Sequence, residues 1–165
     1  MPPAVFVGPM ASGKTKVGKR VARLLGAGFT DTDKAIVRKH GPIAELFATH
    51  GEPHFRVLER EAVRAALRGG DVVSLGGGAI LDADTRAELE PLRVVLLTVS
   101  PDVVAERLAA QTGKRPLVTG GLADWERIFA ERRPFYEEVA TATFDTSGGD
   151  FDAIAREVAA WLTTT

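Results

Sequence analysis

The residues best suited to chemistry stand near the start of the chain, in the stretch Gly8-Pro9-Met10-Ala11-Ser12-Gly13-Lys14-Thr15. This stretch matches the pattern G-x-x-x-x-G-K-[ST], in which backbone N–H groups surround a phosphate group. A lysine in this place can reach the outer phosphates of a nucleotide, and the adjacent hydroxyl can ligate Mg²⁺. An accidental match is disfavoured because an apolar strand is predicted before the motif and a helix after it. The candidate nucleotide-binding residues are Ala11, Ser12, Gly13, Lys14, Thr15 and Lys16.

Two carboxylates follow, Asp31 and Asp33, at the end of a strand predicted over residues 29–33. In an open parallel sheet, ligands bind at the carboxyl ends of the strands, so we expect both acids to share a cleft with the phosphate loop. Residues at i and i+2 of a strand point the same way. One acid near Mg²⁺ and one near a substrate hydroxyl is a division that suits phosphoryl transfer. The alternative for Asp33 is a plain N-cap of the helix predicted over 34–40.

Arg56 and Glu59 lie one turn apart on a helix predicted over residues 54–68, where they can form an i, i+3 pair. With a shorter helix over 43–50, this segment makes an insertion of about residues 33–68. It is larger than a crossover between parallel strands requires, so it is a candidate substrate-binding module. Taken alone, the pair is more typical of a solvated surface salt bridge.

Two glycine-containing loops are placed to touch a ligand. Residues 76–78 are three consecutive glycines at the end of a strand predicted over 71–75, a pattern that lets a ligand or another backbone approach closely. Residues 111–122 hold three glycines, a proline and the cation Arg115 beside a lysine. We expect this segment to be a lid that brings an arginine to the transferring phosphoryl group. An ordinary surface loop is the alternative.

The elements that must position these residues alternate between strand and helix. Further helices are predicted over residues 16–25, 82–89, 102–110, 124–139 and 151–162, and further strands over 4–7, 93–99 and 142–145. Asp82 is expected to cap its helix, and Pro134 is expected to kink the helix that contains it. This alternation predicts an α/β fold with right-handed crossovers and a mostly parallel sheet. At 165 residues, the chain is expected to form a single domain, residues 1–165.

Composition excludes several classes of function. The formal net charge is −1, so we expect no nucleic-acid partner, whose binding would need a basic surface. The chain has no cysteine, which excludes a disulfide framework, a thiol nucleophile and a Cys-ligated zinc. No apolar run has the length of a bilayer span, and the N-terminus enters a strand at once, so we expect neither a membrane partner nor a signal peptide. A cytoplasmic monomer is the expectation.

Taken together and in order, these motifs resemble the shikimate kinase family, from residue 4 to about residue 162. Each motif is weak alone, but five of them in the right order after a phosphate loop are fairly specific. The matching segments are Asp31-Thr32-Asp33 (D-x-D), Phe55-Arg56 with Glu59 (F-R-x-x-E), Gly76-Gly77-Gly78, Arg115-Pro116-Leu117 in the lid, and Arg132 followed by Pro134, Tyr136, Val139 and Ala140.

The resemblance implies a five-stranded parallel sheet in a three-layer α/β/α arrangement, the P-loop NTP hydrolase fold of nucleoside-monophosphate-kinase type. It also implies ATP-dependent phosphorylation of the 3-hydroxyl of shikimate with Mg²⁺. Thr15 would ligate the metal, supported by Asp31 through water, and the catalytic residues would be Lys14, Asp33 and Arg115. Arg115 would also bind the nucleotide. The implied substrate-binding residues are Asp33, Arg56, Glu59, Gly76, Gly77, Gly78 and Arg132. Glu59 would hold Arg56, and the two arginines would bind the substrate carboxylate.

Three departures from the family pattern bear on nucleotide binding and on the lid. Ala11 stands where many relatives have glycine, and we expect it to be tolerated unless the position needs a left-handed backbone. Residues 147–149 offer no basic or amide side chain near the adenine end, and the lid is short around residues 118–121. The alternative functions are a gluconate kinase or another polyol-carboxylate kinase on the same fold. A nucleotide-binding module without catalysis is disfavoured because Lys14 and Asp33 are both present.

Overall fold

Five short strands form one parallel sheet at the centre of the molecule. The computed structural model describes residues 1–110 and 120–164. The strands are β1 (Val5–Val7), β2 (Phe29–Asp31), β3 (Val72–Ser74), β4 (Val94–Thr98) and β5 (Ala142–Asp145), in the spatial order β2-β3-β1-β4-β5. Every pairing between neighbouring strands is parallel. The predicted five-stranded parallel sheet is therefore confirmed.

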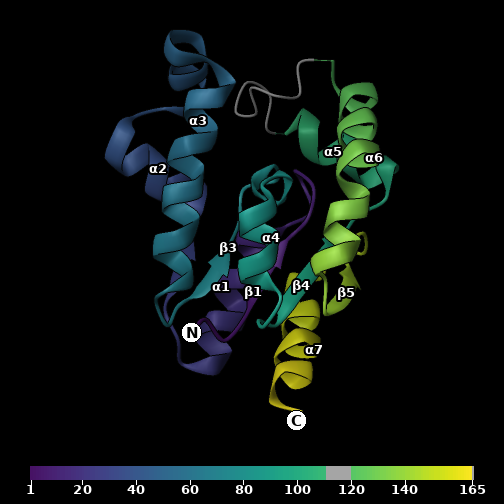
Figure 1. Cartoon of the computed structure of the whole chain (residues 1–165). Helices are drawn as coiled ribbons and strands as arrows, with labels where there is room; N and C mark the ends of the chain where they lie inside the picture. Colours follow the sequence, from purple (N-terminus) through teal and green to yellow (C-terminus); the bar gives the residue numbers. More distant parts are fainter. Residues whose placement is uncertain (111–119, 165) are drawn as a thin grey trace.

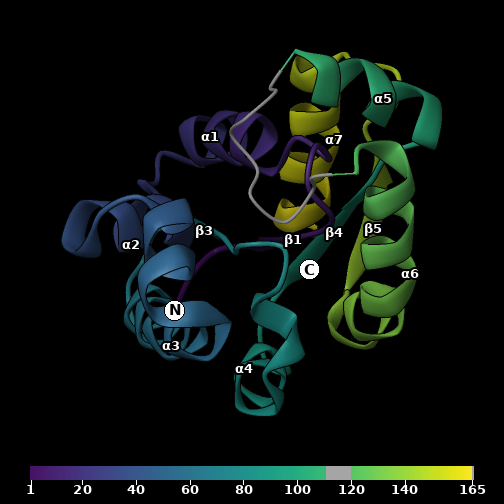
Figure 2. The same ribbon diagram turned by 90° about the horizontal axis from the view of Figure 1, so that it is seen from above.

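Helices cover both faces of this sheet (Figures 1 and 2). The first face carries α1 (Lys14–Leu25) and α7 (Phe151–Thr163), and the second carries α3 (Ile43–Leu67), α4 (Ala83–Leu89) and α6 (Leu122–Val139). The other elements are α2 (Thr32–His40), α5 (Pro101–Ala109) and the short 3₁₀ helix η1 (Ala79–Leu81). This arrangement confirms the predicted three-layer fold.

Alternate residues of the central strands fill two separate core layers. Phe6 and Leu97 pack with Val17 of α1 and Val158 of α7. Val5, Val7 and Leu96 point to the opposite side, into a cluster that includes residues of α3, α4 and α6. Strands buried on both faces read as continuous apolar runs, which is why β4 could be recognised in the sequence.

The insertion between β2 and β3 has a small core of its own. Ile36 of α2 packs there with Leu46, Phe55 and Leu58 of α3. Gly51 has φ 81° and ψ 171°, a conformation that interrupts α3 and divides it into two helical pieces, as predicted. The helix α6, in contrast, continues through Pro134. No helix in the described ranges combines the length and apolar character needed to cross a membrane.

The end of β2 differs from the prediction in a way that matters for the site. The strand ends at Asp31 and α2 begins at Thr32, so Asp33 lies in the first helical turn rather than on the strand. Asp31 is the N-cap, because its Oδ1 accepts hydrogen bonds from the backbone N–H groups of Asp33 (2.9 Å) and Lys34 (3.2 Å). The alternative that Asp33 is a plain N-cap is therefore wrong, and Asp33 Oδ1 instead lies beside Gly76.

Candidate active site

The phosphate loop runs from β1 into α1 and ends in an open helix N-terminus. Gly13 is the N-cap with φ 90°, no side chain caps the helix, and no acid stands in its first turn. The ammonium of Lys14 donates to the carbonyls of Gly8 (2.7 Å) and Pro9 (3.1 Å), so it lies across the loop. The Oγ of Ser12 is buried and, in the described part of the chain, makes no hydrogen bond. A helix N-terminus without a side-chain cap, a lysine and an unsatisfied buried hydroxyl together fit a bound phosphate group.

Three successive carbonyls of this loop accept hydrogen bonds from side chains far away in the sequence. Trp125 Nε1 donates to Met10 O at 2.7 Å, Arg107 Nη1 to Ala11 O at 2.7 Å, and Thr146 Oγ1 to Ser12 O at 2.6 Å. These bonds tie the backbone of the loop to α6, α5 and the segment after β5. Sequence reasoning missed all three donors, because no local pattern links them to the loop.

Ala11 adopts φ 66°, the left-handed conformation that glycine tolerates best. The sequence analysis expected alanine to be tolerated unless this position needs a left-handed backbone, and the position does need one. The methyl group is buried with Val99, Val104 and Trp125, so the side chain gains packing that offsets part of the backbone strain.

Thr15 and Asp31 lie together beside the loop, as predicted. Thr15 Oγ1 donates to Asp31 Oδ2 at 3.0 Å, while Oδ1 is held by the start of α2. Two hard oxygen donors side by side fit Mg²⁺, which completes its shell with water and substrate phosphates. Within residues 1–110 and 120–164, no group of three or more His, Cys, Asp or Glu residues is arranged to hold a metal ion.

Each of the three glycines after β3 (Gly76, Gly77 and Gly78, the glycine loop) lies beside a different charged side chain. A β-carbon at any of them would come close to that side chain. A β-carbon on Gly76 would lie 2.5 Å from Asp33 Oδ1, and one on Gly78 would lie 2.5 Å from Arg56 Nη1. At Gly77 it would lie 3.2 Å from Arg132 Nη1. The loop thus brings Asp33 of α2, Arg56 of α3 and Arg132 of α6 around one stretch of backbone, and the groups nearest to it are these side chains.

Arg56 is held from both sides by acids on its own helix. Its Nη1 donates to Glu59 Oε1 at 2.8 Å and its Nη2 to Glu52 Oε1 at 3.0 Å. Burial alone would lower the pKa of Arg56, but its pairing with Glu59 and Glu52 raises the pKa by more, so the net shift is upward. Burial raises the pKa of Glu59 above its usual range, although Arg56 opposes this shift. Glu59 is only 4% exposed, so the solvated surface salt bridge is excluded.

Two further residues fix the glycine loop. The hydroxyl of Tyr136 donates to Gly77 O at 2.5 Å, and burial raises the pKa of this hydroxyl to about 12. Thr32 Oγ1 accepts from Gly76 N at 3.2 Å and is fully buried. Both residues stand inside motifs that the sequence analysis quoted, Tyr136 one turn after Arg132 and Thr32 between the two acids. Their place in those motifs was the only sequence signal for them.

A cavity of about 360 Å³ opens beside these groups, between α3 and the start of α4. Its wall includes Arg56, Glu59 and Gly78 from the predicted site. Lys16, also predicted, is exposed and lies over the Phe151 ring, 5.3 Å from its centroid. Arg115 and the lid segment from 111 to 119 lie outside the described residues.

Comparisons with known proteins agree with this geometry. The family model described as shikimate kinase matches residues 10–163. The chain belongs to the shikimate kinase family. It is 46% identical to the shikimate kinase of Salinispora arenicola over 164 residues, 98% of each chain, and 46% identical to that of Streptomyces coelicolor over 149 residues, 89% of this chain and 87% of the other.

Among solved structures, a shikimate kinase resembles the chain more closely than a gluconokinase does. The shikimate kinase of Acinetobacter baumannii in complex with shikimate superposes with a TM-score of 0.88 at 34% identity, over 94% of this chain and 89% of that one. A gluconokinase from Sinorhizobium meliloti has a TM-score of 0.62 at 23% identity, over 96% of this chain and 90% of that one. The second likeness shows a shared fold and nothing more.

Proposed function

We propose that this chain transfers the γ-phosphoryl group of ATP to the 3-hydroxyl of shikimate, with Asp33, Arg56 and Arg132 acting on the acceptor. The observation that carries the proposal is the glycine loop, whose backbone lies against those three side chains at once. A carboxylate and two guanidinium groups around one backbone segment suit an acceptor that has both a hydroxyl and a carboxylate. Membership of the shikimate kinase family makes shikimate the first choice.

On the acceptor side, Arg56 and Arg132 bind the carboxylate of the substrate. They come from different helices, α3 and α6, so they approach that carboxylate from two directions. A planar guanidinium matches a carboxylate better than an ammonium does. Asp33 orients the accepting hydroxyl and takes its proton as the phosphoryl group arrives.

On the nucleotide side, the open N-terminus of α1 and the buried Ser12 hydroxyl bind phosphate oxygens. Lys14 stabilises negative charge on the transferring group, for which its ammonium leaves the carbonyls of Gly8 and Pro9. Thr15 and Asp31 are the residues that would hold Mg²⁺. When bound, this ion offsets charge on the β- and γ-phosphates. Arg115 is proposed to contribute a second positive charge.

A coupled assay of ADP release tests the proposal, with shikimate, with gluconate and without acceptor. We expect shikimate to accelerate ADP release by at least about 100-fold over the rate without acceptor, because ordering a good acceptor multiplies the rate steeply. Chelation of divalent cations by EDTA should abolish this turnover. Acceleration by gluconate with none by shikimate would favour the second candidate, and equal rates in all three arms would exclude both kinases.

A further inference from the structure

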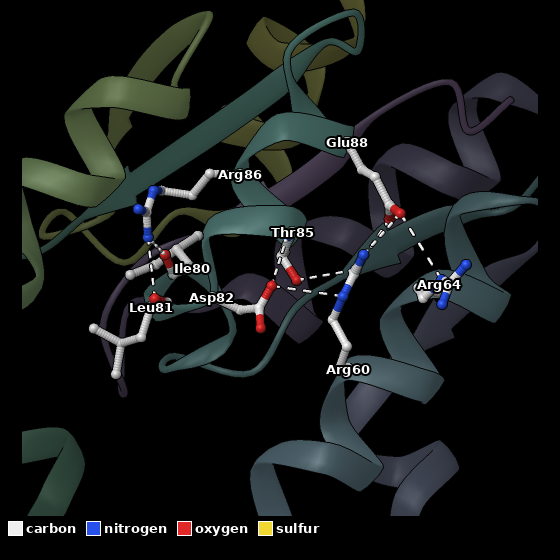
Figure 3. Close-up of polar contacts among 8 residues, drawn as sticks. All are labelled: Arg60, Arg64, Ile80, Leu81, Asp82, Thr85, Arg86 and Glu88. Carbon is white, nitrogen blue, oxygen red and sulfur yellow. Dashed lines mark hydrogen bonds and ion pairs between the residues drawn. The ribbon is translucent and has the colours of Figure 1, made fainter.

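Outside the residues that touch the acceptor, an arginine-centred cluster joins α3 to α4. Arg60 of α3 donates from Nη2 to Glu88 Oε1 (2.8 Å) and from Nη1 to Glu88 Oε2 (3.0 Å) and Thr85 Oγ1 (3.2 Å). Its Nε lies 3.5 Å from Asp82 Oδ1. Figure 3 shows the guanidinium reaching across from α3 toward these three side chains. We call Arg60, Asp82, Thr85 and Glu88 the α4 brace.

The α4 brace stands one helical turn from Arg56. Residues four apart on a helix share a face, so Arg56 and Arg60 both point toward the segment that follows β3. Arg56 meets Gly78 at the start of that segment, and Arg60 meets the start of α4 only a few residues later. Arg60 therefore ties α3 to the segment that directly follows the glycine loop.

Apolar packing alone does not join α3 to the segment between the glycine loop and α4. The cavity of about 360 Å³ lies between α3 and η1, and Arg60, Asp82 and Thr85 belong to its wall. Apolar contact between α3 and this segment is resumed at Val63, which shares a buried cluster with Ile80 and Leu89. Across the hollow part, the polar contacts of Arg60 join the two elements.

The other side of the same segment is tied to α6. Arg86 Nη1 donates to the carbonyls of Ile80 (2.8 Å) and Leu81 (3.1 Å), as Figure 3 also shows. Its Nε lies 2.8 Å from Glu138 Oε2, and its guanidinium lies 4.4 Å from the centroid of the Phe135 ring. The segment 76–82 is thus held between the helix that carries Arg56 and the helix that carries Arg132.

We propose that Arg60, through the α4 brace, is a positioning residue that sets the distance between Arg56, the glycine loop and Arg132, and so sets the affinity for the acceptor. This inference rests on the proposed function, because it assigns Arg56 and Arg132 to the acceptor carboxylate. Arg60 itself touches no reacting group. Its effect falls on acceptor binding and leaves the phosphate loop, on the other side of the glycine loop, unchanged.

Steady-state kinetics of Arg60→Met test this role. The expected result is a rise in the KM for shikimate on the order of tenfold, because displacement of a binding group by about 1 Å is costly. The kcat and the KM for ATP should stay within about twofold of wild type. Arg64→Met is the matched control: Arg64 lies one turn further along α3, is 52% exposed and approaches Glu88 only at 3.9 Å. It should leave all three constants unchanged.

A second variant separates positioning from loss of fold. Glu88→Gln keeps Arg60 and its contacts with Thr85 and Asp82 but removes the charged partner, so it should raise the KM for shikimate by a smaller factor, about threefold. Arg60→Lys should fall between Arg60→Met and wild type. An unchanged KM for shikimate in Glu88→Gln and in folded Arg60→Met would overturn the proposal. So would an equal rise in the KM for ATP.

A distance measurement between α3 and α6 tests the α4 brace without any enzyme turnover. The chain has no cysteine, so spin labels can be placed at Val57→Cys on α3 and Glu131→Cys on α6, both exposed positions. Double electron–electron resonance should give a broader or shifted distance distribution in Arg60→Met and an unchanged one in Arg64→Met. Identical distributions in both would refute the brace. If wild type fails to phosphorylate shikimate but the distances shift as expected, the proposed function fails and the brace stands.

Discussion

Arg132 lies 7% exposed on α6, where its guanidinium faces the Gly77 backbone and the hydroxyl of Tyr136. A charged group buried at this depth is expensive unless it is compensated, and we propose that a bound carboxylate supplies that compensation. Arg133, the next residue, points to solvent and pairs with Glu137 at 2.8 Å. The two neighbours therefore offer a direct comparison between a site arginine and a surface arginine.

Arg132→Ala should raise the KM for shikimate by about 10- to 100-fold, the factor expected when a hydrogen bond between charged groups is lost. The KM for ATP and the slow ATP hydrolysis without acceptor should change little. Arg133→Ala should behave as wild type in the same assay. If Arg132→Ala instead weakened ATP and shikimate equally, Arg132 would belong to the nucleotide side.

Glu59 makes the stability of the protein depend on pH. Burial raises its pKa above the ordinary value of 4.5, so the folded state keeps a proton at pH values where the unfolded chain has lost it. The contribution of Glu59 to stability is then largest below pH 4.5 and is lost as pH rises through the folded-state pKa. In Glu59→Gln this titration is absent.

Urea unfolding of wild type and Glu59→Gln between pH 4 and pH 7.5 measures this effect. The free energy of unfolding of wild type, relative to the variant, should fall as pH rises. A difference that grows with pH would mean that attraction to Arg56 outweighs burial, and that the folded state favours the charged form of Glu59.

At the scale of elements, the phosphate loop combines a strained residue with supporting contacts. A left-handed conformation costs a residue with a β-carbon about 1–2 kcal/mol. Removing the buried methyl of Ala11 costs about 0.8 kcal/mol, and glycine adds about 0.5–1 kcal/mol of chain entropy. These contributions nearly cancel, so the loop accepts alanine.

Ala11→Gly should therefore change the free energy of unfolding by less than about 1 kcal/mol, while Ala11→Val should lower it by more than about 2 kcal/mol, because a β-branched residue is a genuine outlier at positive φ. Chemical denaturation of the three proteins measures both differences. A gain above about 1 kcal/mol in Ala11→Gly would show that the packing of the methyl does not offset the strain.

The glycine loop gives a second test at this scale. A methyl on Gly78 would collide with the end of the flexible Arg56 side chain, which can move aside. Gly78→Ala should thus raise the KM for shikimate by about tenfold or more with only a small loss of stability. Gly70→Ala is the control, because a β-carbon there meets nothing within 4 Å. A Gly78→Ala enzyme with wild-type affinity for shikimate would remove Arg56 from acceptor binding.

The sequence predicted those parts of the site that short motifs define. Lys14, Thr15, Asp31 and the three glycines stand at strand ends, and parallel topology brings strand ends together. The contacts of Trp125, Arg107 and Thr146 with the phosphate loop could not be predicted, because they join positions about one hundred residues apart. The end of β2 was misplaced by two residues, since the strand was predicted to reach Asp33 while Asp31 already caps the following helix.

At the scale of the whole molecule, the two substrates are assigned to different sets of elements around one edge of the sheet. The phosphate loop follows β1 and is supported by α5, α6 and the segment after β5, while the acceptor residues come from α2, α3, the loop after β3 and α6. The chain as a whole has a formal net charge of −1, yet Lys14, Arg56 and Arg132 gather at this edge. Asp31, Asp33 and Glu59 lie at the same edge, so the site brings charges of both signs together.

Nuclear magnetic resonance of the reaction product tests the central claim most directly. With ATP, Mg²⁺ and shikimate, we expect one new phosphate ester, on the 3-hydroxyl. Asp33→Asn should form this ester at least about 100-fold more slowly, because general-base assistance is lost. Ester formation on a different hydroxyl, release of inorganic phosphate with no ester, or unchanged turnover in Asp33→Asn would contradict it.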